Sequence, residues 1–199
     1  MFDVTGIILI GGRSTRMGSD KALLPLDGST LLQYCVTTIE KIVDEIVVVN
    51  APNRAIPAIH SDIPLVFGQD RLVNEGPLIG IAAGLELARA SITIVTAVDM
   101  PLIRSELLEL LIKKVDSNHK WVVPIADGRP QPLCSALLTS SLPIINTKIL
   151  EGVRAPMALA GDLNTYMLEE DEWKEVDPNG QSFKNINTPK EFSSLLDLF

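Results

Sequence analysis

The sequence predicts an α/β fold built on a mostly parallel sheet, and three observations carry this prediction. Strand-like and helix-like segments alternate over the first 115 residues, which implies right-handed crossovers between parallel strands. The run at residues 45–49 reads as β-branched and apolar at every position, as in a strand that helices cover on both faces, and residues 92–98 form the most strand-like run of the chain. With 199 residues, 46% of them hydrophobic and 21% charged, the chain suits a single domain with a sizeable core.

The first half of the chain contains four predicted strands and three predicted helices. The strands are expected at residues 6–10, 45–49, 65–67 and 92–98. The helices are expected at residues 31–43, 78–90 and 105–115, the first capped by Ser29 or Thr30. Gly80 and Gly84 fall on one face of the second helix, where either close packing or approach to a ligand would explain them.

The second half is less regular. A strand at 121–125, a turn at 127–128 and a returning segment at 131–138 predict an antiparallel element in the sheet. Residues 139–163 are expected to be helical in pieces broken by Pro143 and Pro156, and residues 169–173 to form an acidic, solvated loop. The last helix is marked by Thr188 as its cap, Pro189 in its first turn and Glu191 at the capping-box position.

Charge and hydropathy exclude two classes of partner. A formal charge of −8 argues against a general nucleic-acid binder, whose affinity would come from a basic surface. No apolar run approaches the length of a membrane span, and Asp3 stands where a signal peptide would be basic. We therefore expect a cytoplasmic protein that binds neither nucleic acid nor membrane.

The cysteines and histidines give no sign of a metal or redox site. Cys35 and Cys134 lie far apart and outside any Cys-x-x-Cys pattern, so two buried free thiols are expected. His60 and His119 are equally isolated, which favours surface or structural positions over metal ligation.

The stretch from Leu9 to Lys21 reads as an anion-binding loop. Gly11 and Gly12 follow the first strand and allow the backbone to turn and bring its amides close to a ligand. Arg16 and Lys21 add two cations, which suits a polyphosphate. The spacing fits neither the P-loop nor the dinucleotide fingerprint.

Asp99 is the candidate metal ligand. It follows the most strand-like run of the chain and precedes Pro101, so its carboxylate is expected at the carboxyl edge of the sheet, where α/β proteins bind ligands. Asn50 is expected at the same edge. A turn or helix-capping function is the alternative for Asp99.

The motif Gly-Gly-x-Ser-x-Arg-Met-Gly-x-Asp-Lys at residues 11–21 resembles the opening signature of nucleotidyltransferases with a three-layer Rossmann-like fold. The segments at 76–81, 99–101, 129–137 and 185–189 are similar to later motifs of the molybdenum cofactor guanylyltransferase family within that group. The resemblance covers nearly the whole chain. It implies one nucleotidyltransferase domain over residues 1–199, with a nucleotide-binding half at 1–101 and a second-substrate half at 102–199.

The resemblance also implies the functions of individual residues. Arg16, Lys21 and Asp99 would be catalytic, with Asp99 binding Mg²⁺. The residues expected to bind the nucleotide are Leu9, Ile10, Gly11, Gly12, Lys21, Asn50, Asp70, Gly76, Gly80 and Asp99. Those at the position of a second, anionic substrate are Gln131, Arg154, Lys184, Asn185 and Asn187, for which purely structural functions remain open.

The implied reaction transfers GMP from GTP to the terminal phosphate of molybdopterin and releases pyrophosphate. The resemblance further implies transient contacts with other cofactor assembly proteins and with recipient molybdoenzymes. Three alternatives stay open, namely a molybdopterin cytidylyltransferase, a sugar-phosphate nucleotidyltransferase and a non-catalytic GTP-binding regulatory module. Competition between GTP and CTP would distinguish the cytidylyltransferase. Residues 102–199 are fewer than a sugar-phosphate nucleotidyltransferase is expected to need for binding its sugar.

Overall fold

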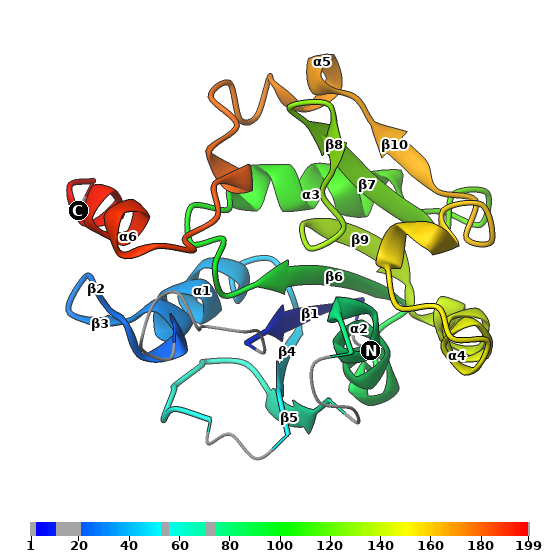
Figure 1. The fold of residues 1–199 in the computed structure, drawn as a ribbon, viewed down its shortest axis with the longest axis horizontal. Coiled ribbons are helices and arrows are strands. Elements are labelled where there is room, and N and C mark those ends of the chain that lie inside the picture. The colour runs from blue at the N-terminus through cyan, green and yellow to red at the C-terminus, as the bar shows by residue number, and fades with distance from the viewer. Residues whose placement is uncertain (1–2, 11–20, 53–55, 71–74, 199) are drawn as a thin grey trace.

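The computed structural model describes residues 3–10, 21–52, 56–70 and 75–198, and it has the predicted α/β architecture (Figure 1). An eight-stranded sheet has the strand order β10-β7-β9-β6-β1-β4-β5, with β8 paired to β7. Its strands are β1 (Val4–Leu9), β4 (Glu45–Asn50), β5 (Leu65–Gln69), β6 (Ile92–Ala97), β7 (Trp121–Ala126), β8 (Arg129–Pro130), β9 (Ser135–Leu138) and β10 (Tyr166–Leu168). A separate two-stranded hairpin joins β2 (Pro25–Leu26) to β3 (Ser29–Thr30).

Helices cover both faces of this sheet. The helices of eight or more residues are α1 (Leu31–Ile39), α2 (Pro77–Leu87), α3 (Ser105–Lys114), α4 (Leu142–Leu150) and α6 (Pro189–Leu196). Buried side chains of α1, α3 and α6 belong to one core cluster, and those of α2 and α4 belong to the other. The three layers predicted for the chain are therefore confirmed.

The parallel part of the sheet follows the predicted strands closely. β1 pairs in parallel with β4 on one side and with β6 on the other, and β4 pairs in parallel with β5. Every residue of β4 is buried, as expected of a strand covered on both faces. The four strands consequently end at one edge of the sheet, the edge at which open α/β sheets bind ligands.

The antiparallel strand β9 is an inner strand of the sheet and not an edge strand added by a hairpin. β9 is inserted between β6 and β7 and runs antiparallel to both. β7 therefore runs in the same direction as β6, and β10 pairs with β7 in parallel. A strand at β10 was not expected from the sequence, since three residues give too little periodicity to recognise.

Two predictions for the second half were wrong. Pro143 does not break a helix, because it lies in the first turn of α4, where proline is tolerated. Residues 169–173 are not a solvated loop: Glu170–Trp173 form the short helix α5, closed by a capping box between Glu169 and Glu172. Trp173 is buried, and its Nε1 donates a hydrogen bond to the carbonyl of Ile125 at 2.8 Å. Burial of Trp173 thus holds this segment against the protein, although its other residues are acidic.

The helix predicted at residues 31–43 is shorter than expected. Thr30 caps α1 by accepting a hydrogen bond from the backbone N–H of Gln33 at 3.2 Å. The helix ends at Ile39, because the chain turns there so that Val43 enters the core and Glu45 can begin β4. The capping-box start predicted for α6 is confirmed, with Thr188 and Glu191 as its two members.

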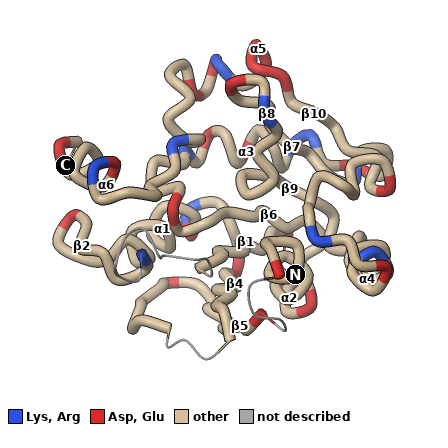
Figure 2. The backbone as a smooth tube through the Cα atoms, in the orientation of Figure 1, with Lys and Arg blue, Asp and Glu red and all other residues tan. Residues whose placement is uncertain are grey.

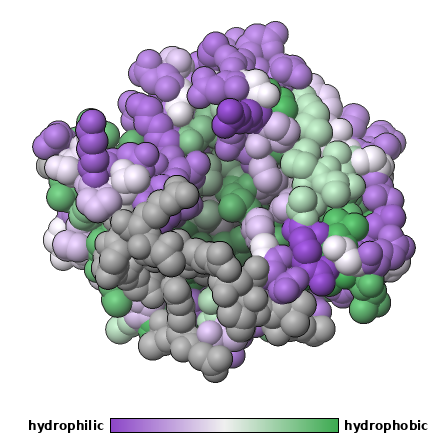
Figure 3. All heavy atoms as spheres, in the orientation of Figure 1, coloured by the Kyte–Doolittle hydropathy of each residue, from purple (hydrophilic) through white to green (hydrophobic). Residues whose placement is uncertain are grey.

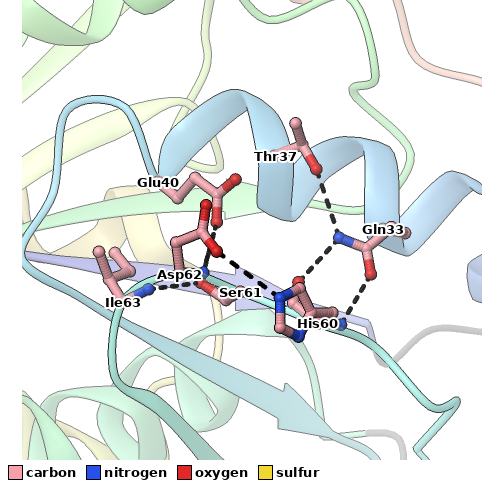
Figure 4. Close-up of polar contacts among 7 residues, drawn as sticks. All are labelled: Gln33, Thr37, Glu40, His60, Ser61, Asp62 and Ile63. Carbon is pink, nitrogen blue, oxygen red and sulfur yellow. Dashed lines mark hydrogen bonds and ion pairs between the residues drawn. The ribbon is translucent and has the colours of Figure 1, made fainter.

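The outer side of α1 holds the segment that leads from β4 to β5 (Figure 4). The side chain of Gln33 donates to the carbonyl of His60 at 2.8 Å and accepts from its N–H at 2.8 Å. Glu40, the residue that directly follows α1, accepts from the hydroxyl of Ser61 at 2.9 Å. These contacts fix residues 60 and 61 against α1, shortly before β5 begins.

Figure 4 also shows the side chain of His60, which is 88% exposed and lies 3.6 Å from the carboxylate of Asp62. The ring of His119 packs edge-on against Tyr166. Both cysteines are buried free thiols, as expected. None of the helices in the described ranges combines the length and the apolar composition that a transmembrane helix requires.

A buried carboxylate lies at the opposite end of the sheet from the strands' carboxyl ends. The side chain of Glu45 has no exposed surface, although the run it begins was read from the sequence as apolar. It accepts hydrogen bonds from Thr5 Oγ1 at 2.7 Å, and from the backbone N–H and the Nε of Arg89 at 2.6 Å each. Burial alone would raise the pKa of this carboxyl, but the hydrogen bonds and the charge of Arg89 outweigh it and hold the pKa below its usual value.

We expect Arg89→Ala to destabilise the fold by about 2 kcal/mol, because a buried carboxylate loses its charged partner. The guanidinium is 52% exposed, so the loss should be smaller than for a fully buried ion pair. Urea unfolding at pH 7 measures the change. Arg104→Ala, which removes an exposed pair with Glu106, is the control and should cost less than about 0.5 kcal/mol.

The same substitution has a predicted pH dependence. The pKa of Glu45 is lower in the folded state than in the unfolded chain, so its stabilisation is complete above the unfolded value, roughly 4.3, and is lost as pH falls through the folded value. The stability difference between wild type and Arg89→Ala should therefore shrink in acid. A difference that stays constant down to the acid unfolding of the protein would contradict this account.

Candidate active site

Three residues from distant parts of the chain meet at the edge of the sheet where the parallel strands end. Nζ of Lys21 lies 3.0 Å from Oδ2 of Asp99 and donates a hydrogen bond to Oδ1 of Asn187 at 2.7 Å. The side chains of Lys21 and Asp99 are 14% and 26% exposed. A cation, a carboxylate and an amide thus form one partly shielded polar cluster, and we call Lys21, Asp99 and Asn187 the polar triad.

Lys21 enters the triad from a short 3₁₀ helix, η2 (Lys21–Leu23). Its neighbour Ala22 is buried in the core beside α1, which fixes the backbone from which the lysine side chain extends. Gly11, Gly12 and Arg16, which were predicted to bind phosphate, lie outside the described residues. The last described residues before them, Leu9 and Ile10, are at the carboxyl end of β1, and the N–H of Ile10 bonds to the carbonyl of Val49.

Asp99 is held in the loop between β6 and α3. The N–H of Val98 bonds to the carbonyl of Leu9 at 3.0 Å, and that of Met100 bonds to the carbonyl of Ala97 at 3.0 Å. The carbonyl of Asp99 itself accepts from the N–H of Ile186 at 2.8 Å. The carboxylate therefore projects from a backbone that is fixed on both sides, as a preorganised charge requires.

Asn187 reaches the triad because the C-terminal segment is tied down at several points. The carboxylate of Glu191 accepts from the N–H groups of Asn187 at 2.7 Å and of Thr188 at 2.8 Å. Those hydrogen bonds, and the nearby charge of Lys21, lower the pKa of Glu191 from its usual value. Further back, the hydroxyl of Ser182 accepts from the N–H of Arg104 at 3.0 Å, which joins this segment to the start of α3.

The anchor of that segment is Asp177, a carboxylate that is only 1% exposed. It accepts from the N–H of Gln181 at 3.0 Å and from that of Ser182 at 2.8 Å. The turn that it closes leads directly into residues 184–187. The position of Asn187 therefore depends on the tertiary packing of the C-terminal segment against α3 and not on the local sequence alone.

Asn50, Asp70 and Gly80 gather at the ends of β4 and β5, away from the triad. The N–H of Asp70 bonds to the carbonyl of Asn50 at 2.8 Å, and a Cβ placed on Gly80 would lie 3.9 Å from Oδ2 of Asp70. Three strand positions separate β6 from β5. At roughly 4.8 Å per strand, this separation is about 14 Å.

The structure shows what Gly80 and Gly84 of α2 contact. A Cβ on Gly84 would come within 2.6 Å of Cδ1 of Ile7, so Gly84 is required for packing against β1. A Cβ on Gly80 would lie 3.3 Å from Leu9, which leaves that position close to both the strand end and Asp70. Gly76 precedes the helix with a φ of +96°, a value that favours glycine.

Of the predicted second-substrate residues, only Asn187 is a member of the polar triad. Gln131 donates to the carbonyl of Arg129 at 3.3 Å, and Lys184 and Asn185 are exposed. Arg154 lies beside Gly76 and forms an ion pair with Glu75, so it is associated with the α2 end of the site. Nothing in the sequence indicated that Glu75 pairs with Arg154. The sequence did indicate the capping box of Glu191, but not that the same carboxylate also binds the N–H of Asn187.

The two cysteines take no chemical part in the site. Sγ of Cys35 lies 3.8 Å from the carbonyl of Val98, directly beneath the Asp99 loop. Burial, with a contribution from the charge of Asp99, raises the pKa of this thiol to about 12. Burial also raises the pKa of Cys134. Both groups therefore remain protonated at neutral pH and serve as packing.

The triad offers a metal ion one carboxylate. Among the described residues, no three His, Cys, Asp or Glu side chains are grouped so that they could hold a metal by themselves. Oδ2 of Asp99 faces Lys21, while no described residue bonds to its Oδ1. A hard divalent cation bound there would draw its remaining ligands from phosphate oxygens and water, as Mg²⁺ does in nucleotide sites.

The surface around the site is hollowed and mixed in charge. Figure 3 shows a depression where Figure 1 places β6 and β9, with apolar side chains at its floor and hydrophilic side chains along its upper border. In Figure 2, lysine and arginine positions are interspersed with acidic ones over the described tube, and the helix α5 is acidic. A small anionic ligand would thus meet local cations on a molecule whose net charge is negative.

Comparison with known proteins identifies the family of the chain. The family model of the MobA-like NTP transferase domain matches residues 6–160. A protein of Desulfosudis oleivorans, named molybdenum cofactor guanylyltransferase, is 31% identical over 189 residues, covering 94% of this chain and 92% of that one. A protein of Bacillus mycoides, named probable molybdenum cofactor guanylyltransferase, is 30% identical over 203 residues, covering 96% and 95%.

Solved structures share the fold. The molybdopterin-guanine dinucleotide biosynthesis protein A from Archaeoglobus fulgidus superposes with a TM-score of 0.78 at 23% identity, covering 98% of this chain and 97% of that one. The 2-C-methyl-D-erythritol 4-phosphate cytidylyltransferase from Thermus thermophilus has a TM-score of 0.70 at 18% identity, with 98% of each chain covered. The family match spans β1 to the residues after α4, and the chain belongs to the MobA-like NTP transferase family.

Proposed function

We propose that this chain transfers GMP from GTP to the terminal phosphate of molybdopterin, giving molybdopterin guanine dinucleotide and pyrophosphate. The polar triad carries the proposal, because it places a lysine and a carboxylate 3.0 Å apart at the carboxyl edge of the sheet. Its support includes the names of relatives at about 30% identity over nearly the whole chain. Residues 1–101 would bind the nucleotide and residues 102–199 the pterin, within one domain.

The chemistry requires little from the protein beyond position and charge. A phosphate monoester is mostly dianionic at neutral pH, since its second pKa is about 6, so the nucleophile needs no general base. Its oxygen attacks the α-phosphorus of GTP, and the bond to the β-phosphate oxygen breaks as pyrophosphate leaves. The protein must hold two anions in line and stabilise the charge that develops on the leaving group.

Each described residue of the triad has a part in this scheme. Lys21 would bind the phosphates of GTP, and Asp99 would hold Mg²⁺, which neutralises phosphate charge when bound. Asn187 would keep the ammonium of Lys21 directed at the phosphates, because its amide oxygen already accepts from Nζ. Leu9, Ile10, Asn50, Asp70, Gly76 and Gly80 would line the nucleoside end, and Arg16, Gly11 and Gly12 would complete the phosphate loop.

The second substrate would bind to the second half of the chain. Gln131, Lys184 and Asn185 lie on the half that would receive the pterin. The product is a dinucleotide for insertion into an enzyme, so we propose transient contacts with other cofactor assembly proteins and with recipient molybdoenzymes, and none with nucleic acid or membrane. The cytoplasm is the expected location.

We test the reaction with GTP labelled at the α-phosphorus. Purified protein, Mg²⁺ and molybdopterin should move the label into a pterin dinucleotide, and excess unlabelled CTP should not compete. Efficient competition by CTP would indicate a cytidylyltransferase, and bound but unconverted GTP would indicate a regulatory module. Transfer of the label to a sugar phosphate in place of the pterin would also contradict the proposal.

Asn187→Ala should lower kcat about tenfold while changing KM for GTP less. The substitution removes a hydrogen bond to a charged group, which contributes roughly 1.5–3 kcal/mol, and Lys21 loses its fixed direction. Asn179→Ala, at an exposed turn of the same segment, is the matched control and should behave as wild type. Equal kcat for the two variants would show that Asn187 contributes nothing to turnover.

A further inference from the structure

Glu75 and Arg154 form an ion pair between segments that are far apart in the chain. Nε of Arg154 lies 2.6 Å from Oε2 of Glu75, and its Nη1 donates to the carbonyls of Ile149 and Val153 at 2.9 Å each. The carbonyl of Arg154 also lies 3.3 Å from the Cβ position of Gly76. Because two backbone carbonyls and the carboxylate hold the guanidinium, this pair is fixed more firmly than an ordinary surface salt bridge.

The pair lies at the nucleoside end of the site. Gly76 directly precedes α2, and Gly80, one helical turn later, is next to Leu9 and Asp70. α2 packs on β1, β4 and β5, and α4, which leads to Arg154, packs on α2. The ion pair therefore belongs to the β4–β5 side of the sheet edge, whereas Lys21 and Asp99 mark the β6 side.

Each partner retains one unused polar group. No described residue bonds to Oε1 of Glu75 or to Nη2 of Arg154. The two side chains are 45% and 36% exposed, so a ligand can reach these atoms. The pair therefore offers a hydrogen-bond acceptor and a donor side by side, both charge-assisted.

We propose that this pair reads the Watson–Crick edge of guanine, an inference that rests on the guanylyl transfer proposed above. Guanine has the acceptor O6 beside the donors N1–H and N2–H₂, so O6 would accept from Nη2 of Arg154 while N1–H and N2–H₂ donate to Oε1 of Glu75. Adenine and cytosine place a donor where O6 stands and an acceptor next to it, which opposes both groups. Arg154, expected to bind the second substrate, is thereby assigned to the first.

Base analogues separate the contribution of each partner. Hypoxanthine in ITP keeps O6 and N1–H but lacks the 2-amino group, and uracil in UTP has the corresponding acceptor and donor. The wild-type protein should bind GTP most tightly, ITP and UTP next, and ATP and CTP most weakly. Equilibrium binding in the presence of Mg²⁺ measures this order without requiring turnover.

Two substitutions have different expected effects. Glu75→Ala should lower the ratio of GTP to ITP affinity about tenfold or more, because only Glu75 receives the 2-amino group. Arg154→Ala should weaken GTP and ITP alike and leave their ratio unchanged, while the ratio of GTP to ATP affinity falls about tenfold. Glu75→Gln, which keeps an acceptor but no charge, should fall between wild type and Glu75→Ala.

The control is Glu151→Ala, which removes another acidic residue from the loop after α4, paired with Lys148 at 3.1 Å. It should leave every ratio as in wild type. If the Glu75–Arg154 pair only joined two segments, Glu75→Ala would weaken all nucleotides equally, and an unchanged ratio of GTP to ITP affinity would overturn the inference. If instead wild type binds GTP selectively through Glu75 but transfers no GMP to molybdopterin, the proposed function fails and this inference stands.

Discussion

Lys21→Ala is expected to lower kcat for pyrophosphate release by about 100-fold or more, the usual loss when one preorganised charge is removed from a reacting centre. Nζ of Lys21 is the cation of the polar triad, held by Asp99 and Asn187 at 3.0 and 2.7 Å. Steady-state kinetics with saturating GTP and pterin measure the loss. The thermal unfolding midpoint should change little, because the apolar anchor of this segment is Ala22 and not the lysine.

Two further variants make this prediction specific. Lys21→Arg keeps the charge but replaces a compact ammonium with a longer planar group, so it should recover only part of the activity. Lys190→Ala removes an exposed lysine of α6, close to the triad in sequence but outside it, and should retain wild-type turnover. Wild-type kcat in Lys21→Ala would refute the assignment of the triad as the reacting centre.

Asp99→Asn should also reduce kcat by about 100-fold or more, and it should change the response to metal. The amide preserves the shape of the side chain but is a poorer ligand for a hard cation than a carboxylate. We therefore expect the Mg²⁺ concentration for half-maximal activity to rise, with partial recovery at high Mg²⁺. Titrating Mg²⁺ against turnover in wild type and variant tests both effects.

Asp197→Asn is the control for this substitution, since Asp197 is an exposed residue at the end of α6. It should match wild type in both kcat and metal response. An Asp99→Asn enzyme with reduced kcat but an unchanged Mg²⁺ requirement would mean that Asp99 acts by orienting Lys21 and not as the metal ligand. Full activity would exclude both functions.

The sequence was most informative where local pattern and tertiary position coincide. The alternation of strands and helices up to α3 predicted the parallel sheet, because each apolar run is long enough for its periodicity to be recognised. Asn50 and Asp99 follow such runs, so their place at the carboxyl edge could be inferred before the structure. Thr188 and Glu191 form a motif four residues long and were equally recognisable.

The sequence was least informative where the structure depends on contacts between distant segments. β9 lies between β6 and β7 through pairings that no short window contains. The burial of Glu45 depends on Thr5 and Arg89, which are 40 and 44 residues away. The Glu75–Arg154 pair spans 79 residues, and Asn187 reaches Lys21 across 166. A charged residue considered alone in a sequence is expected to be exposed to solvent. Its ion-pair partner becomes known only from the structure.

The most direct test of the central claim is pyrophosphate release by the purified protein with Mg²⁺, in four reactions that contain GTP, molybdopterin, both or neither. We predict release only when both substrates are present, with loss of the signal in Lys21→Ala and in Asp99→Asn. Release from GTP without the pterin would contradict a transfer reaction. If no pyrophosphate is released with both substrates present, although GTP still binds, the claim that this chain is an enzyme would be contradicted.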